Sequence, residues 1–370
     1  MSKYKIMTPG PVQVPENVRL ARSLSTTNAD LDPQFYDEYK ETCELISELL
    51  HTKNETLILS GEGILGLEAA CASMTEPGDR VLILDNGIYG AGFADFVSMY
   101  GGTPVMYTKD YKNAFDVDEL DAYLKEDHDF KYATVVHCDT PSGMLNDIHK
   151  ICPLLKSYGI MTVTDSVSGM FGNEVNVDKA QIDILCGGSQ KAVSAPPGLT
   201  FVTISDEAKK AMENRKTPIA SFYCNLTIFK DYYKNLWFPY TMPISDIYGL
   251  KAAMDNIAAD KDLIKRHARI ANATRKAIEA FGLKLHLESG FSDTVTVFDV
   301  PEGMTADDIL ERMREKHGIM LAGSFGELAG KVIRIGHMGA SANVGDMLEV
   351  MFGLEETCLL YTSDAADDLT

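Results

Sequence analysis

Four polar features of this sequence follow or interrupt short apolar runs, where their side chains could act on a small molecule. They are the turn Ser60–Gly63, Asp165, Lys191 and Arg334. A glycine-containing turn that opens a helix presents backbone N–H groups to an anion such as phosphate. A carboxylate at a strand end can hold a cation or a protonated ring nitrogen. Each feature also has an ordinary structural explanation, such as a tight turn, a cap, a solvated lysine or an internal ion pair.

Lys191 and Arg334 have the most specific chemistry of the four. Lys191 lies in Gly-Gly-Ser-Gln-Lys directly after a predicted strand at 183–186. A lysine amine with a lowered pKa is a nucleophile that forms a Schiff base with an aldehyde. Arg334 interrupts the apolar run Val332–Gly336, and a buried guanidinium needs an anionic partner such as a carboxylate. The order of phosphate turn, Asp165, Lys191 and Arg334 is the order expected of a pyridoxal phosphate enzyme.

The elements that must position these residues alternate between strands and helices. Strand patterns at 55–60, 80–85, 132–137 and 160–164 are separated by helical patterns. This alternation predicts an α/β fold with a mostly parallel sheet covered by helices, which binds ligands at the carboxyl ends of its strands.

The pattern changes after about Ser245. A helical stretch to Phe281, broken near 260–262, precedes strands at 294–300 and 331–335 and a helix at 306–317. These elements predict a smaller α+β domain. The expected division is an N-terminal segment at 1–20, a large domain at 21–245 and a small C-terminal domain at 246–357.

Composition narrows the class of partner. The chain has 370 residues, with 34 Lys and Arg against 54 Asp and Glu, so its net charge is −20. Such an acidic chain repels nucleic acid and anionic lipid, and no apolar run reaches the roughly 18 residues of a membrane span. The seven cysteines contain no CxxC pair, which favours free thiols over disulfides or a metal site. We therefore expect a cytoplasmic protein that acts on small molecules.

The last residues, 358–370, differ from the helical pattern that precedes them at Val344–Glu356. They are polar, follow no helix stop signal and look like the translation of a sequencing adapter. We expect the native sequence to differ after about Thr357. The alternative is a frayed natural C-terminus.

Several motifs together resemble one family. They are Thr8–Pro11, Gly61–Ala70, Asn86–Gly90, His137–Gly143, Thr164–Ser168, Gly188–Ala192, Pro196–Gly198 and Arg334–Gly339. In these stretches the chain resembles the class V pyridoxal-phosphate-dependent aminotransferases, in particular the alanine–glyoxylate and serine–pyruvate type. The resemblance implies fold type I and a homodimer with its site at the subunit interface.

The resemblance also implies roles for individual residues. Lys191 would form the Schiff base with pyridoxal 5'-phosphate and move the substrate proton, and Asp165 would keep the ring nitrogen protonated. Arg334 would bind the substrate carboxylate. The remaining cofactor contacts would be Tyr89 and Val167 on the two ring faces, Thr140 at the ring hydroxyl, Gly63, Ile64 and Gln190 at the phosphate, and Thr241 from the second subunit.

Three departures from the family pattern concern the edges of this site. Glu62 stands where the family usually has a small hydroxyl residue, and a carboxylate there should repel a phosphate dianion. Either it faces solvent at the helix N-terminus, or it contacts the substrate or the neighbouring subunit. Phe238 replaces a tyrosine whose hydroxyl Tyr240 could supply. Asp30 and Asp32 replace a basic patch in the entry loop.

The expected function is transamination between a small amino acid, alanine or serine, and glyoxylate or pyruvate. An (S)-ureidoglycine–glyoxylate transaminase is one alternative. A lyase or desulfurase on the same scaffold is another, and it needs a mobile cysteine. Cys138 and Cys186 at strand ends disfavour it, whereas Cys224 in a less regular stretch keeps it open. A binding protein without catalysis is the last alternative.

Overall fold

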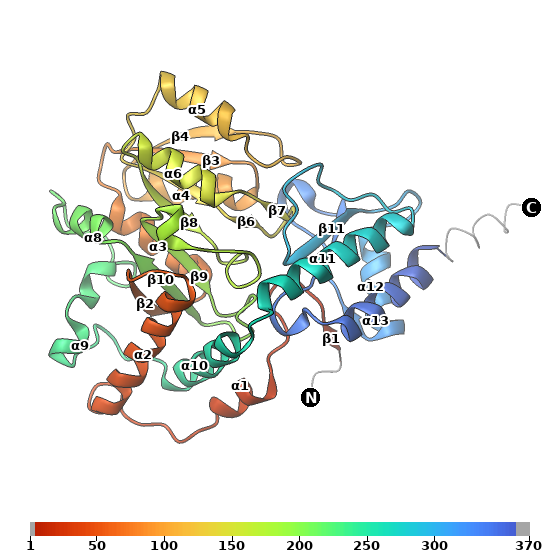
Figure 1. Cartoon of the computed structure of the whole chain (residues 1–370), viewed down its shortest axis with the longest axis horizontal. Coiled ribbons are helices and arrows are strands. Elements are labelled where there is room, and N and C mark those ends of the chain that lie inside the picture. The colour runs from red at the N-terminus through yellow and green to blue at the C-terminus, as the bar shows by residue number, and fades with distance from the viewer. Residues whose placement is uncertain (1–3, 360–370) are drawn as a thin grey trace, which may run out of the picture.

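A computed structural model of the chain describes residues 4–359. Its larger part is built around a seven-stranded sheet with the order β2-β10-β9-β8-β5-β3-β4 (Figure 1). The strands from β9 to β4 run parallel, whereas β10 is antiparallel to both of its neighbours. The strands are β2 (Glu55–Ser60), β3 (Arg80–Asp85), β4 (Thr103–Thr108), β5 (Tyr132–Val136), β8 (Met161–Asp165), β9 (Ile184–Gly188) and β10 (Leu199–Ile204). This mostly parallel sheet confirms the predicted α/β class.

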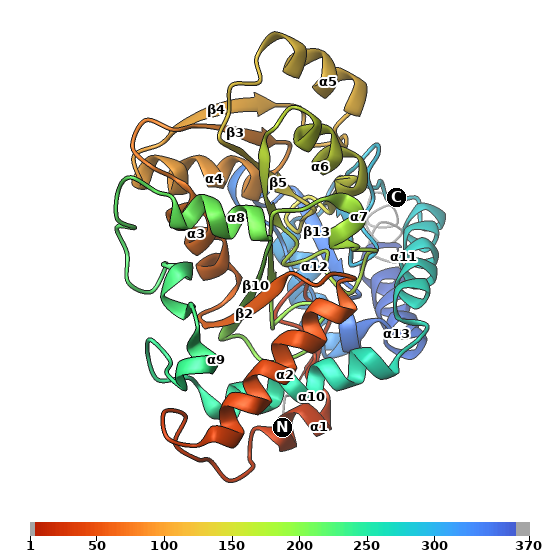
Figure 2. The same cartoon turned by 60° about the vertical axis from the view of Figure 1, so that its left-hand side comes forward.

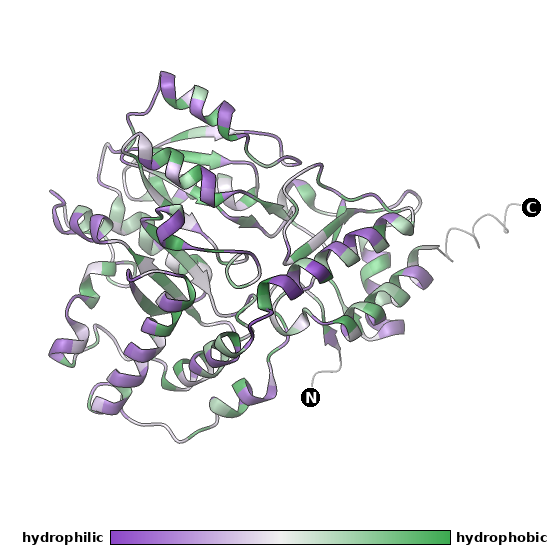
Figure 3. Cartoon of the chain, in the orientation of Figure 1, coloured by the Kyte–Doolittle hydropathy of each residue, from purple (hydrophilic) through white to green (hydrophobic). Residues whose placement is uncertain are grey.

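Helices cover the sheet on both sides (Figure 2). They are α2 (Pro33–Leu49), α3 (Gly63–Met74), α4 (Ile88–Met99), α5 (Val117–Glu126), α6 (Ile148–Ser157), α7 (Val177–Ala180) and α8 (Asp206–Glu213). Because both sheet faces are covered, every residue of β5, β9 and β10 is buried. The strands are correspondingly apolar, while polar residues gather on the outer faces of helices such as α2 and α5 (Figure 3).

A smaller group of elements follows in the C-terminal part. It contains α11 (Leu263–Ala280), β11 (Val295–Asp299), α12 (Ala306–His317), β12 (Ile319–Met320), β13 (Val332–Gly336) and α13 (Val344–Leu354). The break predicted near 260–262 is confirmed, because α10 (Ile244–Ala259) ends just before α11 begins. The predicted helix at 306–317 is also confirmed. The proposed domain boundaries at residues 20, 245 and 357 stay predictions.

The N-terminal segment joins this C-terminal group. Strand β1 (Lys5–Ile6) pairs in parallel with β12, and Met7 packs in a hydrophobic cluster with residues from Ile270 to Cys358. The chain then crosses to the larger part through α1 (Glu16–Ala21). The remaining short elements are β6 (Cys138–Asp139), β7 (Met144–Leu145), α9 (Tyr232–Asn235) and 3-10 turns at Leu226–Phe229, Gly326–Leu328 and Gly339–Ser341. None of the helices between residues 4 and 359 is long and apolar enough to cross a membrane.

The chain beyond α13 continues as a π-helical turn, Glu355–Leu359. Cys358, the first residue of the segment expected to be non-native, is 1% exposed and belongs to the C-terminal cluster. Residues 360–370, which make up most of that segment, lie outside the described residues.

Candidate active site

A cavity of about 300 Å³ opens at the carboxyl ends of the parallel strands. Every predicted cofactor-binding residue except Thr241 lines it, and so do six residues that were not predicted to bind a ligand. The lining comprises Gly10, Pro11, Glu62, Gly63, Ile64, Leu67, Tyr89, Thr140, Asp165, Val167, Ser168, Gln190, Lys191 and Pro197. The fold therefore brings residues from widely separated parts of the chain to one place, as the order of motifs predicts.

Lys191 lies just after β9 with its amine inside this cavity. Its Nζ donates a hydrogen bond of 2.8 Å to the carbonyl of Pro9. Burial, aided by the positive charge of Arg334, lowers the pKa of Lys191 to about 8. At pH 7 about a tenth of the amine is therefore uncharged and able to attack an aldehyde, far more than for a lysine with the ordinary pKa of 10.5.

The N-terminal segment packs against the side chain of Lys191 at Gly10. Its φ of +111° lies in a region that favours glycine, and a Cβ added there would lie 2.4 Å from Cδ of Lys191. This position therefore requires glycine for two reasons, its backbone conformation and the close approach of Lys191.

Asp165 is the last residue of β8 and is 4% exposed. One carboxylate oxygen accepts a hydrogen bond of 2.8 Å from the backbone N–H of Val167. Burial raises the pKa of Asp165 to about 7, and the neighbouring charges of Asp139 and Glu62 act in the same direction. A protonated ring nitrogen would offset the cost of the buried carboxylate, because an adjacent cation favours its ionised form.

Tyr89, on α4, is positioned by residues that sequence reasoning missed. Its backbone N–H donates to Oδ1 of Asp139 at 3.0 Å, and Oδ2 of Asp139 accepts from the Ser142 hydroxyl at 2.6 Å. The ring of Phe325, from the C-terminal part, meets the Tyr89 ring edge-on at 6.2 Å. The available signal for Asp139 was an aspartate two residues after the predicted strand at 132–137, whereas no local pattern marks Phe325.

Thr140 and Ser168 form one polar edge of the cavity. Their hydroxyls are hydrogen-bonded to each other, so either can present an oxygen to a ring substituent. Thr140 was predicted for this role, whereas Ser168 was seen only as part of a motif.

Arg334 lies on β13 beside the cavity, although it is outside the residues that line it. Its Nε donates to the carbonyl of Gly323 at 2.5 Å, and Nη1 donates to the carbonyl of Thr140 at 3.4 Å. Within residues 4–359, no carboxylate forms an ion pair with this guanidinium. Its charge is therefore available to a carboxylate of a small molecule placed next to Thr140.

The predicted phosphate turn has a different arrangement from the one expected. Glu62 is the N-cap of α3, and its Oε1 accepts from the backbone N–H of Ile64 at 3.1 Å. Its Oε2 accepts from Nε2 of Gln190 at 3.0 Å. Two of the three donors expected to bind phosphate, Ile64 and Gln190, therefore already bind the carboxylate of Glu62.

Three residues near the start of α10 lie away from the cavity of this chain. Thr241 is exposed, as expected of a residue that acts in a second subunit, and this role stays a prediction. Phe238 is buried and stacks on Tyr36 with ring centroids 4.5 Å apart. The hydroxyl of Tyr240 is buried and has no hydrogen-bond partner among the residues described.

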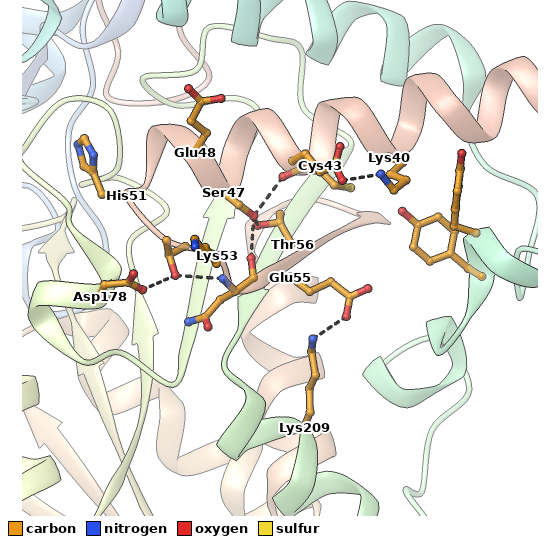
Figure 4. Close-up of a pocket in the computed structure, with 15 residues that line it drawn as sticks. Lys40, Cys43, Ser47, Glu48, His51, Lys53, Glu55, Thr56, Asp178 and Lys209 are labelled. Carbon is orange, nitrogen blue, oxygen red and sulfur yellow. Dashed lines mark hydrogen bonds and ion pairs between the residues drawn. The ribbon is translucent and has the colours of Figure 1, made fainter.

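A larger hollow of about 870 Å³ lies elsewhere, between α2, β2, α8 and α9 (Figure 4). Its polar groups bond to one another. Lys209 pairs with Glu55 at 2.9 Å, and the hydroxyls of Ser47 and Thr56 are 2.7 Å apart. None of the predicted site residues lies there. The smaller cavity around Lys191 is therefore the candidate site.

A lysine, an aspartate and a helix N-terminus gathered at the strand ends of an α/β sheet define a pyridoxal-dependent enzyme of fold type I. The profile of the class V aminotransferases matches residues 18–336, and the chain belongs to this family.

Individual relatives agree with this assignment. An uncharacterized aminotransferase of Methanocaldococcus jannaschii is 33% identical over 341 residues, which cover 91% of this chain and 88% of that protein. The pyridoxamine–pyruvate transaminase of Mesorhizobium japonicum is 33% identical over 347 residues, 91% of this chain and 86% of that protein. The crystal structure of an alanine–glyoxylate aminotransferase from Nostoc sp. superposes with a TM-score of 0.92 at 27% identity, over 96% of this chain and 95% of that one.

Family and neighbours imply pyridoxal 5'-phosphate as the cofactor. The ring end of the cavity fits it, because Lys191, Asp165, Tyr89 and Val167 all line one space. The phosphate end does not fit in the observed conformation, because the carboxylate of Glu62 occupies two of the three predicted donors there.

Proposed function

We propose that this class V aminotransferase transfers the amino group of a small amino acid, alanine or serine, to a small 2-oxo acid, glyoxylate or pyruvate. The observation that carries the proposal is a single cavity that contains Lys191 and Asp165 and is bordered by the guanidinium of Arg334, which has no carboxylate partner among residues 4–359. The small cavity volume of about 300 Å³ favours small substrates.

A bound pyridoxal group supplies an aldehyde for a Schiff base and a ring that withdraws electrons. The uncharged amine of Lys191 would hold that group and would carry the proton removed from the substrate Cα. The carbonyl of Pro9 keeps the amine in place at 2.8 Å. Asp165 would hold a proton on the ring nitrogen, and Arg334 would bind and orient the substrate carboxylate.

The desulfurase alternative requires a mobile, reactive thiol. Cys138, Cys186 and Cys224 are 1%, 0% and 5% exposed, and burial raises the pKa of each thiol. A buried thiol with a raised pKa is a poor nucleophile. The cysteines of this chain therefore support transamination over sulfur chemistry.

Visible spectroscopy tests the proposed reaction. The purified protein with a bound pyridoxal compound should be yellow, lose its colour with L-alanine and regain it with glyoxylate. Lys191→Ala should abolish both the Schiff-base colour and turnover, while the exposed control Glu302→Ser retains them. Normal turnover in Lys191→Ala would overturn the assignment of the proton carrier.

We further propose a homodimer that completes each site with the partner's copy of Thr241. Exposed aromatic side chains close to this residue in sequence support the idea: Phe222, Tyr223, Tyr233 and Trp237 are 58%, 52%, 38% and 54% exposed. A second copy covering this segment would remove that apolar surface from water. Sedimentation should show a dimer, and Trp237, the one tryptophan of the chain, should change its emission on dissociation. A monomer at micromolar concentration with full activity contradicts this proposal.

We infer a cytoplasmic location from the cysteines. All seven are free thiols, as expected of a protein in a reducing compartment. Cell fractionation tests this inference.

Pyridoxamine is a second candidate amino donor. The position of Glu62 on the phosphate donors favours a donor without phosphate, and one relative is named as a pyridoxamine–pyruvate transaminase. Direct formation of pyridoxal from pyridoxamine and pyruvate by the purified protein tests it.

A further inference from the structure

We propose that the carboxylate of Glu62 takes the place of a phosphate at the phosphate end of the cavity. The site would therefore select vitamers that lack the 5'-phosphate. The inference rests on the proposed transamination and identifies the residue that decides which pyridoxal compound the site accepts.

The first support is the position of the carboxylate. Glu62 bonds both to the backbone N–H at the start of α3 and to the Gln190 side chain, at 3.1 and 3.0 Å. These are the charge-assisted bonds that a phosphate oxygen would otherwise make. A phosphate group would have to displace Glu62 and then lie next to its charge.

The second support is the charge of the cavity wall. Among the described residues that line the cavity, Glu62 and Asp165 are the acids and Lys191 is the single cation. The charge of Glu62 reaches the reactive groups, because it adds to the raised pKa of Asp165 and partly opposes the lowering of the Lys191 pKa by burial. A phosphate dianion would add two negative charges, whereas the hydroxymethyl group of pyridoxal adds none.

The third support is an acceptor without a donor. Gln190 is 6% exposed, and its Oε1 is buried without a hydrogen-bond partner among the residues described. Its amide nitrogen must face Glu62, because a carboxylate only accepts hydrogen bonds, so Oε1 has to find a donor elsewhere. A hydroxymethyl group can donate a hydrogen bond to Gln190 or Glu62, whereas a fully ionised phosphate can only accept one.

Close packing leaves the turn little freedom to rearrange. A Cβ at Gly63 would lie 2.8 Å from both Cγ atoms of Val167, and a Cβ at Gly188 would lie 2.9 Å from Oε1 of Gln190. The backbone N–H of Gly61 donates to the carbonyl of Gly198 at 2.8 Å. The backbone of the phosphate end is therefore held between α3, Val167 and the segment after β9.

A phosphate-free vitamer would act as a substrate. Pyridoxamine and a 2-oxo acid would give pyridoxal and an amino acid. The amine nitrogen forms a C=N bond to the oxo carbon with loss of water, and Lys191 moves one proton from the pyridoxamine methylene carbon to that carbon. Water then cleaves the new C=N bond, so the methylene carbon is oxidised to the aldehyde, the oxo carbon is reduced and no other reagent is needed.

Binding of the two vitamers to one protein preparation tests the inference. Dissociation constants for pyridoxal and pyridoxal 5'-phosphate are measured from the visible band in the native chain stripped of bound vitamers. The variants are Glu62→Ser, Glu62→Gln and the exposed control Glu302→Ser. We expect the native chain and the control to bind pyridoxal more tightly than its phosphate. We expect Glu62→Ser to shift the ratio toward the phosphate by about 10- to 100-fold, the effect of restoring a charge-assisted bond.

The outcomes separate this inference from the proposed function. If the native chain binds the phosphate form more tightly, Glu62 moves aside and the inference is wrong while transamination stands. An unchanged ratio in folded Glu62→Ser overturns it as well. If neither vitamer forms a Lys191-dependent visible band, the proposed function itself fails. The native ratio alone decides the question if both Glu62 variants fail to fold.

Discussion

Replacing Asp165 by asparagine tests the physical state of the ring-binding carboxyl. Burial raises its pKa from 3.8 to about 7, so the folded chain holds this proton more tightly than the unfolded chain does. Stability therefore falls as pH rises from about 4 to about 7, and the full penalty is present above that range. At 1.36 kcal/mol per pKa unit, the penalty is about 4 kcal/mol. Asparagine avoids it and can still accept the hydrogen bond from Val167.

Urea unfolding of the protein freed of pyridoxal compounds measures this effect. Asp165→Asn and the native chain should be about equally stable near pH 4, and the variant should be more stable by up to about 4 kcal/mol near pH 8. Asp95→Asn, an exposed aspartate on α4, is the control and should show no such trend. A pH-independent difference for Asp165→Asn would refute the reasoning, because it would mean that the carboxyl titrates alike in both states.

Three further changes test other parts of the site. Gly10→Ala should slow Schiff-base formation and destabilise the fold by about 1–3 kcal/mol, because of its positive φ and the contact with Lys191; band kinetics and urea unfolding measure this, and native behaviour would contradict it. Arg334→Ala should raise KM for amino acids about tenfold or more, with vitamer binding unchanged; an unaltered KM would move the carboxylate site elsewhere. Cys138→Ala should leave turnover unchanged, since burial raises the pKa of this thiol to about 11; loss of turnover would support the desulfurase alternative.

The ring end of the site could be predicted because local patterns mark the ends of strands. Asp165 closes an apolar strand and Lys191 follows the next one, so a parallel sheet must bring them to the same edge. The placement of Phe238 could not be predicted, because its ring packs with Tyr36 from α2 instead of facing the cavity. Phe238 lies in an aromatic core, where a hydroxyl is not needed, and residue type alone does not reveal this position.

The contacts that position Lys191 and Arg334 each join distant parts of the chain. Pro9 follows β1, whose partner β12 belongs to the C-terminal part, and its carbonyl bonds to an amine 182 residues further along. Arg334 reaches Thr140 from the same C-terminal part, through a bond between residues 194 positions apart. Neither contact follows from local periodicity, because each requires the smaller part to be packed against the sheet. The lysine, the carboxylate-binding arginine and their supports therefore form one site only when both parts are folded together.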